Sequence, residues 1–287
     1  MDLLIQQIFN GFTLGSIYCL VALGLTLIYG IMEVPNFAHG HLYMVGGYVT
    51  FFMMTLYGIN YWLSAIISGI VLAALGILLE RMVFNPMRNT PSTNKFIAAV
   101  GAMMFIEAVA RVLWGSDFRS IPAIYDNVVV IGGIRLTEQR LIIIAGAVIL
   151  MIALYVFLKH TLVGSTIEAM AQNRDGASLV GIDVNRVAML TFAVASILAS
   201  AAASLSGPIF LVYPGMGSLI IMKVFVIIVI GGMGSIPGAV LGSFILGMTE
   251  SLGSTYISSD YKDVIAFAIL VLILSIKPSG LFAKGAR

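Results

Sequence analysis

Long apolar runs separated by short polar stretches dominate this chain of 287 residues. A helix needs roughly 20 apolar residues to cross the hydrocarbon core of a bilayer. The runs lack the period-two alternation of barrel strands, so they predict helices, whose backbone satisfies its own hydrogen bonds in lipid. We expect an all-α, polytopic integral membrane protein, with residues 1–287 in a single transmembrane domain of eight or nine transmembrane helices. The apolar segments are 5–30, 42–57, 62–79, 96–114, 141–158, 188–205, 219–230, 239–252 and 264–276, of which two are short for a full crossing.

Composition agrees with a membrane location. Hydrophobic residues make up 60% of the chain and charged residues 10%, and the mean hydropathy is +1.06. Soluble domains carry about 25% charged residues, so a soluble core does not account for this balance. The net charge of +2, without a basic stripe, gives no reason to expect a nucleic-acid partner, and the single cysteine excludes an intrachain disulfide framework. The first seven residues lack the basic region and cleavage site of a signal peptide, so we expect the first apolar run to be retained.

Lysine and arginine gather in three segments, 81–95, 159–186 and 277–287. Even numbers of apolar segments separate them, so all three can lie on the cytoplasmic side that basic residues favour. The 115–140 segment and the N-terminus are then expected outside. An aromatic belt at the outer interface would comprise Tyr57, Tyr61, Trp62 and Trp114.

Glycine and proline interrupt the apolar pattern twice, at 30–41 and at 231–238. Irregular backbone at membrane depth is tolerated where protein or a water-filled cavity surrounds it. In transporters, such interruptions in corresponding halves indicate the substrate pathway, whereas the alternative is a pair of tight turns at the membrane surface. The pathway candidates from these segments are Asn36, His39, Gly40, Gly232, Gly234 and Ser235.

Glu107 is a further candidate because it lies deep within an apolar segment. An ionisable side chain there is costly unless it is paired, and it then marks a functional site by default. Arg111 follows at i+4 on the same helix face, so a purely structural ion pair is the favoured alternative. Lys223 and Glu250 lie near the ends of their segments, where a structural role is also favoured.

The polar loop 159–187 is long enough to fold into short helices. Ser165 and Glu168 fit a capping box, Asp175 could cap a second helix, and Gly181 could end it. A short helix does not hold itself together in water. The loop is therefore expected to lean on the membrane surface or on a protein partner.

Catalytic and cofactor signatures are absent from the sequence. It contains no GxxxxGK[ST] phosphate loop, no Cys/His cluster with metal-ligand spacing and no GxSxG nucleophile motif. We therefore expect no cofactor, no metal and no enzyme activity in this chain. If ATP drives its function, the ATPase is a separate chain.

Three stretches together resemble a known family: GLTLIYGIMEVPNFAHGHLYMVGGY at 24–48, AQNRDGASLVGIDVNRV at 171–187 and IVIGGMGSIPGAVLGSFILG at 228–247. Their order and spacing over essentially the full chain are similar to those of the LivH-type permeases of bacterial branched-chain amino acid ABC importers. The resemblance implies an ABC importer permease fold. Its implied partners are a LivM-like second permease subunit, two ATP-binding subunits, a periplasmic substrate-binding protein and membrane lipid.

The resemblance also implies a role for residues 168–182, which correspond to the coupling element that docks on an ATPase. In the general importer pattern a second alanine follows Glu-Ala and a proline comes later. Here Met170 follows Ala169, and the 159–187 loop contains no proline. The coupling residues implied are Glu168, Ala169, Asn173, Gly176, Gly181 and Ile182.

The family further implies a multi-pass protein of the inner membrane that imports leucine, isoleucine and valine. A permease for urea or short amides is the alternative within the class. An ion-coupled secondary transporter would need coupling-ion ligands in the bilayer, which only Glu107 and residues 33–41 could supply. A membrane scaffold without a pathway is the third alternative.

Overall fold

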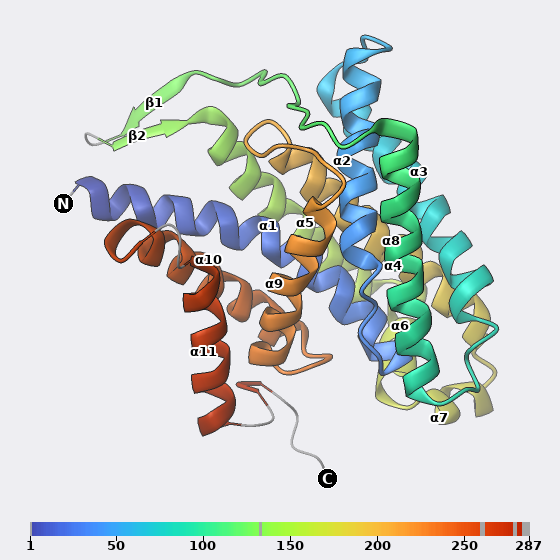
Figure 1. Cartoon of the computed structure of the whole chain (residues 1–287). Coiled ribbons are helices and arrows are strands. Elements are labelled where there is room, and N and C mark those ends of the chain that lie inside the picture. The colour runs from blue at the N-terminus through green and yellow to red at the C-terminus, as the bar shows by residue number, and fades with distance from the viewer. Residues whose placement is uncertain (1, 132–133, 259–261, 278–279, 283–287) are drawn as a thin grey trace.

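The computed structural model describes residues 2–131, 134–258, 262–277 and 280–282. Each of the nine apolar segments expected from the sequence forms a helix, so the fold is all-α as expected (Figure 1). These helices are α1 (Asp2–Met32), α2 (His39–Thr55), α3 (Tyr61–Leu79), α4 (Ser92–Trp114), α5 (Glu138–His160), α8 (Val184–Ser206), α9 (Met216–Gly231), α10 (Ile236–Tyr256) and α11 (Lys262–Ile276). The connecting elements are the π-helical turn η1 (Glu80–Phe84), α6 (Leu162–Gln172), α7 (Arg174–Leu179), β1 (Val128–Ile131) and β2 (Ile134–Thr137).

Helix length divides the bundle into two groups. Among the described residues, six helical spans are long and apolar enough to cross a membrane, which makes the chain a multi-pass membrane protein. Helices α2, α9 and α11 have only 17, 16 and 15 residues. The expected total of eight or nine crossings therefore stays a prediction for these shorter helices.

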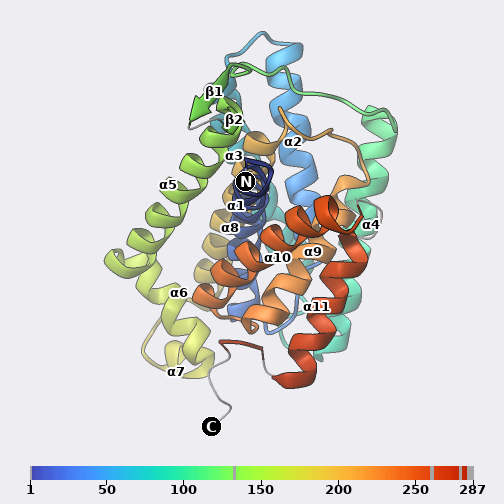
Figure 2. The ribbon, with the colours of Figure 1, turned by 90° about the vertical axis from the view of Figure 1, so that its left-hand side faces the viewer.

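Helices α1 and α8 form the centre of the bundle, and α4 lies at its edge (Figures 1 and 2). In their most apolar windows, 83% of α1 and 72% of α8 is buried, against 11% of α4. Glycines let α1 and α10 approach closely, because a Cβ added at Gly11 would lie 2.9 Å from the Met248 Cα. Helix α4 is thus attached to the bundle by a small part of its surface.

Small hydroxylated residues join α8 to α2 and α3. The Ser68 and Ser200 hydroxyls are 2.7 Å apart, and so are those of Thr50 and Ser204. Such residues allow close helix contact in lipid and supply interhelical hydrogen bonds. The small-residue run at the end of α8 is thereby explained by packing.

The two ends of the bundle differ in their connections. The β1–β2 hairpin, which the sequence does not predict, lies at the same end of the bundle as the α2–α3 turn (Figure 1). The 85–91 connection, α6, α7 and residues 280–282 lie at the other end. The first two basic segments meet there, since Arg88, Lys95 and Arg174 line one small cavity. Lys284 and Arg287 of the third segment fall outside the described residues.

Candidate functional site

The first interruption is irregular backbone that begins at the exposed Glu33 and becomes buried toward α2. Helix α1 ends at Met32, and Glu33 then takes a left-handed φ of 57°, which is uncommon for a residue other than glycine. The Asn36 side chain accepts a hydrogen bond of 3.0 Å from the Ala38 backbone N–H, which leads the chain into α2. Asn36 and His39 are almost completely buried, and His39 Nε2 lies 3.2 Å from the Val21 carbonyl oxygen.

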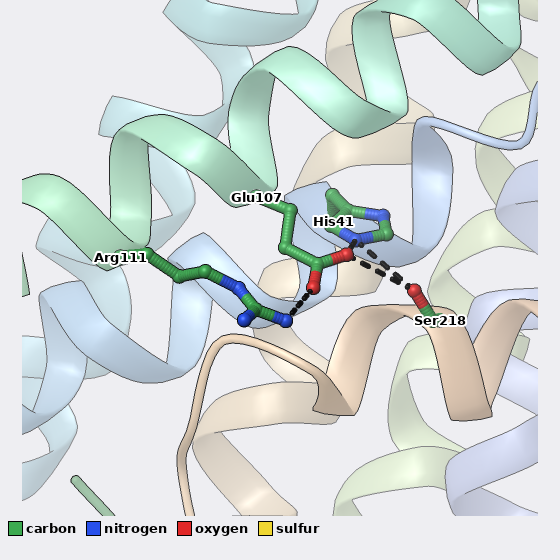
Figure 3. Close-up of polar contacts among 4 residues, drawn as sticks. All are labelled: His41, Glu107, Arg111 and Ser218. Carbon is green, nitrogen blue, oxygen red and sulfur yellow. Dashed lines mark hydrogen bonds and ion pairs between the residues drawn. The ribbon is translucent and has the colours of Figure 1, made fainter. Parts of the chain in front are cut away.

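Glu107 lies at the centre of a polar cluster that joins three helices (Figure 3). Its Oε1 accepts a 2.6 Å hydrogen bond from Arg111, one turn further along α4. Its Oε2 accepts from His41 Nε2 of α2 at 3.0 Å and from the Ser218 hydroxyl of α9 at 3.2 Å. Both carboxylate oxygens therefore have protein partners, and α4 is held to α2 and α9 by them.

The N-termini of α2 and α9 meet beside this carboxylate. Gly40 and Gly217 are in contact, because a Cβ added at Gly217 would lie 2.8 Å from the Gly40 carbonyl oxygen. His41 and Ser218 lie in the first turns of the two helices. The positive ends of both helix dipoles therefore face the region of the Glu107 carboxylate, which favours its charged form.

The cluster lies within the span of α4 and reaches its surface. Glu107 is seven positions before Trp114, or about 10 Å along the helix axis. The Glu107 side chain is 19% exposed and that of Arg111 is 57% exposed, whereas His41 is fully buried. Charges at this depth are costly when they face lipid. This face of α4 therefore requires protein or water against it.

The second interruption is a tight α9–α10 connection. Gly232 and Gly234 take φ values of 96° and 81°, and the Ser235 hydroxyl caps α10 by accepting from the Gly238 N–H at 3.2 Å. Residues 281–282 cover it, since the Leu281 N–H donates to the Ile230 carbonyl at 2.8 Å.

The structure does not bring the two sets of sequence-predicted pathway residues together. Gly40 and Glu107 lie at the start of α9, with Asn36 and His39 next to them in the first interruption. Gly232, Gly234 and Ser235 follow the last residue of that helix. Sixteen helical residues span about 24 Å, so Gly40 and Gly232 lie at opposite ends of α9. The beginning of the first interruption is nevertheless close to the second, because a Cβ added at Gly234 would lie 3.7 Å from the Tyr29 ring.

Two polar arrangements were missed from the sequence. Ser218 completes the Glu107 cluster although no local pattern distinguishes it from other serines. Lys223 of α9 contacts Glu250 of α10 at 2.5 Å, and the Tyr18 hydroxyl donates to the second Glu250 oxygen at 2.6 Å. The sequence favours a structural role for both Lys223 and Glu250 but does not pair them. The only available signal was that opposite charges occur on two successive apolar segments.

The two short helices of the polar loop form as expected, but their caps differ. Thr161 caps α6 by accepting from the Gly164 N–H at 3.0 Å, and Asn173 caps α7 by accepting from the Gly176 N–H at 2.8 Å. Both capping residues have extended backbone, as an N-cap requires. Ser165 is instead inside α6, so the expected capping box is wrong, and Asp175 lies in the first turn of α7.

The loop is fixed to the bundle on one side and free on the other. Glu168 pairs with Lys159 of α5 at 2.9 Å, and the Ile182 N–H donates to the Ala177 carbonyl at 3.1 Å. Ala169 is half-buried, and Gly181, with a φ of 87°, follows the end of α7 as expected. The tip of the loop, at the end of α7, is apolar and exposed: Leu179 is 87% and Val180 is 78% exposed.

Comparison with known proteins gives consistent matches. A family model described as "Branched-chain amino acid transport system / permease component" matches residues 7–274. The chain is 37% identical to the high-affinity branched-chain amino acid transport system permease protein LivH of Escherichia coli K12, over 98% of this chain and 96% of that protein. It is 33% identical to BraD of Pseudomonas aeruginosa over the same shares. It is also 23% identical to LivM of Escherichia coli K12, over 94% of this chain and 68% of that protein.

Proposed function

The chain belongs to the family described as branched-chain amino acid transport system / permease component, and on that premise we propose that it is a permease subunit that imports leucine, isoleucine or valine across the bacterial inner membrane. The observation that carries the proposal is the 37% identity to a LivH protein over 98% of the chain. The multi-helix membrane fold and the buried irregular segment before α2 support it, because transporters bind substrates where helices are interrupted.

The proposed importer contains other subunits. The sequence has no phosphate loop for ATP, so hydrolysis requires two separate ATP-binding subunits. The similarity to a LivM protein as well as to LivH proteins supports a pair of related permease subunits that share one pathway. A periplasmic substrate-binding protein would deliver the amino acid to this pair.

We place the wall of the pathway at the first interruption and at Glu107. Asn36 and His39 supply buried polar side chains there, and Gly40 allows a close approach of backbone to α9. Glu107 supplies a charge at membrane depth. Gly232, Gly234 and Ser235 are proposed to lie near the other end of the same pathway, at the end of α9.

The 159–187 loop is proposed to dock on an ATP-binding subunit. Glu168, Asn173, Gly176 and Gly181 shape it, and its exposed tip consists of Leu179 and Val180. Large apolar side chains exposed at a helix end are suited to a protein contact. The tip would transmit movements of the ATPase to α5 and α8, between which the loop is connected.

Uptake by the complete complex in liposomes tests the function. We expect ATP-dependent accumulation of leucine and none of urea. Accumulation of urea but not leucine would assign the chain to the amide permeases, and leucine uptake without the ATP-binding subunits would indicate a secondary transporter.

A substitution at the loop tip tests the docking. Leu179→Ser should lower co-purification of the ATP-binding subunits, or leucine uptake per complex, at least fivefold. Leu56→Ser is the matched control, because Leu56 is 72% exposed in the α2–α3 turn at the opposite end of the bundle. Equal assembly and uptake of the two variants would exclude the tip as a docking contact.

A further inference from the structure

We infer that Glu107 and Arg111 of α4, supported by His41 and Ser218, bind the ammonium and carboxylate groups of a zwitterionic α-amino acid as it passes through the permease. The inference rests on the proposed function and extends it, because it assigns the polar contacts of the substrate to particular side chains. It also gives a physical reason why an amino acid would be preferred to an uncharged amide.

The first step concerns the position of the cluster. Glu107 and Arg111 lie on the face of α4 that remains partly exposed within its membrane span, and α4 is the least buried of the long helices. A charged pair on such a face is costly against lipid and is expected beside a water-filled pathway or a second subunit. In an importer whose pathway lies between two permease subunits, this face is available to the substrate.

The second step concerns the different hydrogen-bond partners of the two Glu107 carboxylate oxygens. Oε2 is held from within by buried His41 and by Ser218, at 3.0 and 3.2 Å. Among the described residues, Oε1 is held only by Arg111, whose side chain is more than half exposed (Figure 3). Arg111 can therefore move away while the carboxylate keeps its position, which leaves Oε1 as the exchangeable site.

The third step concerns charge balance. An amino acid carries a positive and a negative group on one carbon atom, so it matches the Glu107–Arg111 pair with opposite polarity. Its ammonium would take the place of Arg111 at Oε1, and its carboxylate would accept the paired N–H groups of the released guanidinium. Each charge then exchanges one partner for another, and the penalty of leaving a charge unpaired at low dielectric is avoided.

The fourth step concerns the surroundings. The N-termini of α2 and α9 meet at Gly40 and Gly217 beside the cluster, and their dipoles favour negative charge there. Further toward the start of α4, Phe96 packs against Phe37, which packs against Phe225, each with ring centroids 5.5 Å apart. Helices α4 and α9, together with the segment that leads into α2, thus form an apolar aromatic contact at this level and the polar cluster at the level of Glu107. The charged groups of a substrate are therefore accommodated beside Glu107.

The test compares uptake and binding in the assembled complex. Glu107→Gln and Arg111→Gln should each raise the KM for leucine uptake at least tenfold, while Arg135→Gln, at an exposed position of strand β2, should not change it. Binding of radiolabelled leucine to the complex without the binding protein should be competed by leucine at least tenfold better than by leucinamide, which lacks the carboxylate, or by 4-methylpentanoate, which lacks the ammonium. In Arg111→Gln the advantage over leucinamide should fall to less than threefold.

A structural ion pair alone makes a different prediction. It would lower the thermal stability of both glutamine variants and leave the preference among the three ligands unchanged, which would overturn the inference. If a glutamine variant does not assemble, Glu107→Asp and Arg111→Lys retain the charges but shift them, and an unchanged KM in both would also overturn it. Absence of leucine binding by the wild-type complex would count against the site, while ATP-dependent leucine uptake would still support the proposed function.

Discussion

At the scale of single residues, pairs of charges distant in the sequence decide how the helices are joined. Glu107 attaches the edge helix α4 to α2 and α9, and Glu250 attaches α10 to α1 and α9 through Tyr18 and Lys223. In lipid the hydrophobic effect does not press helices together, so polar contacts contribute specifically to their association. The two carboxylates therefore fix which helices are neighbours.

The Lys223–Glu250 pair gives a prediction about stability. Glu250→Gln removes the carboxylate that pairs with Lys223 inside the bundle, and breaking one side of a buried pair costs about 3–5 kcal/mol. We expect a clear loss of thermal stability in detergent, with part of it recovered in Lys223→Met combined with Glu250→Gln.

The matched control for this prediction is Glu138→Gln. That carboxylate lies at the start of α5 and its hydrogen bond to Asn127 is exposed. A melting temperature of Glu250→Gln equal to that of the control would show that the pair contributes nothing.

At the scale of elements, run length and hydropathy predicted that each of the nine apolar segments forms a helix, because a long apolar run has no other stable backbone state in lipid. Cap positions were predicted less well. Ser165 was expected to begin α6, but only Thr161 has the extended backbone that a cap needs, and the sequence does not reveal that conformation. The β1–β2 hairpin was missed because it lies in a mixed polar segment without strong alternation.

The candidate site was predicted only in part for a related reason. Glu107 was conspicuous as a charge within an apolar run, and Arg111 followed from helical periodicity. His41 and Ser218 are 66 and 111 positions away from Glu107 in the chain, and only tertiary packing brings them to its carboxylate. No local pattern carries that information.

The π-helical turn η1 gives a prediction at the same scale. Glu80 is buried there and pairs with Arg88 at 3.1 Å, and Arg88 also donates to Asn185 at the start of α8. Arg88→Ala would leave the buried carboxylate unpaired and release the 85–91 connection from α8. We expect a loss of about 3–5 kcal/mol in stability, measured by thermal unfolding.

Arg81→Ala is the appropriate comparison, because Arg81 belongs to the same turn and is exposed. Surface substitutions usually change stability by less than about 0.5 kcal/mol. Equal effects of the two substitutions would contradict the assigned role of Arg88.

At the scale of the whole molecule, the bundle has a basic end and an opposite end that carries the hairpin (Figure 1). The distribution of arginine and lysine predicts that the basic end is cytoplasmic. In intact cells, cysteines at Asn89 and Gln172 should be protected from a membrane-impermeant thiol reagent, and a cysteine at Ile124 should react. The native Cys19 is buried and should contribute little background. Labelling of Asn89→Cys or Gln172→Cys without permeabilisation would reverse the orientation.

The last described residues of the chain have a consequence for biogenesis. Leu281 and Phe282 donate backbone hydrogen bonds to the carbonyls of Ile230 and Gly231, at 2.8 and 3.1 Å. The end of a helix leaves such carbonyls without helical partners. Translation reaches these two donors about 50 residues after α9 has been made, so the last carbonyls of α9 gain these partners well after the helix itself is synthesised. A nascent chain that stops short of Leu281 would carry an unfinished helix end into the membrane and be open to quality-control proteolysis.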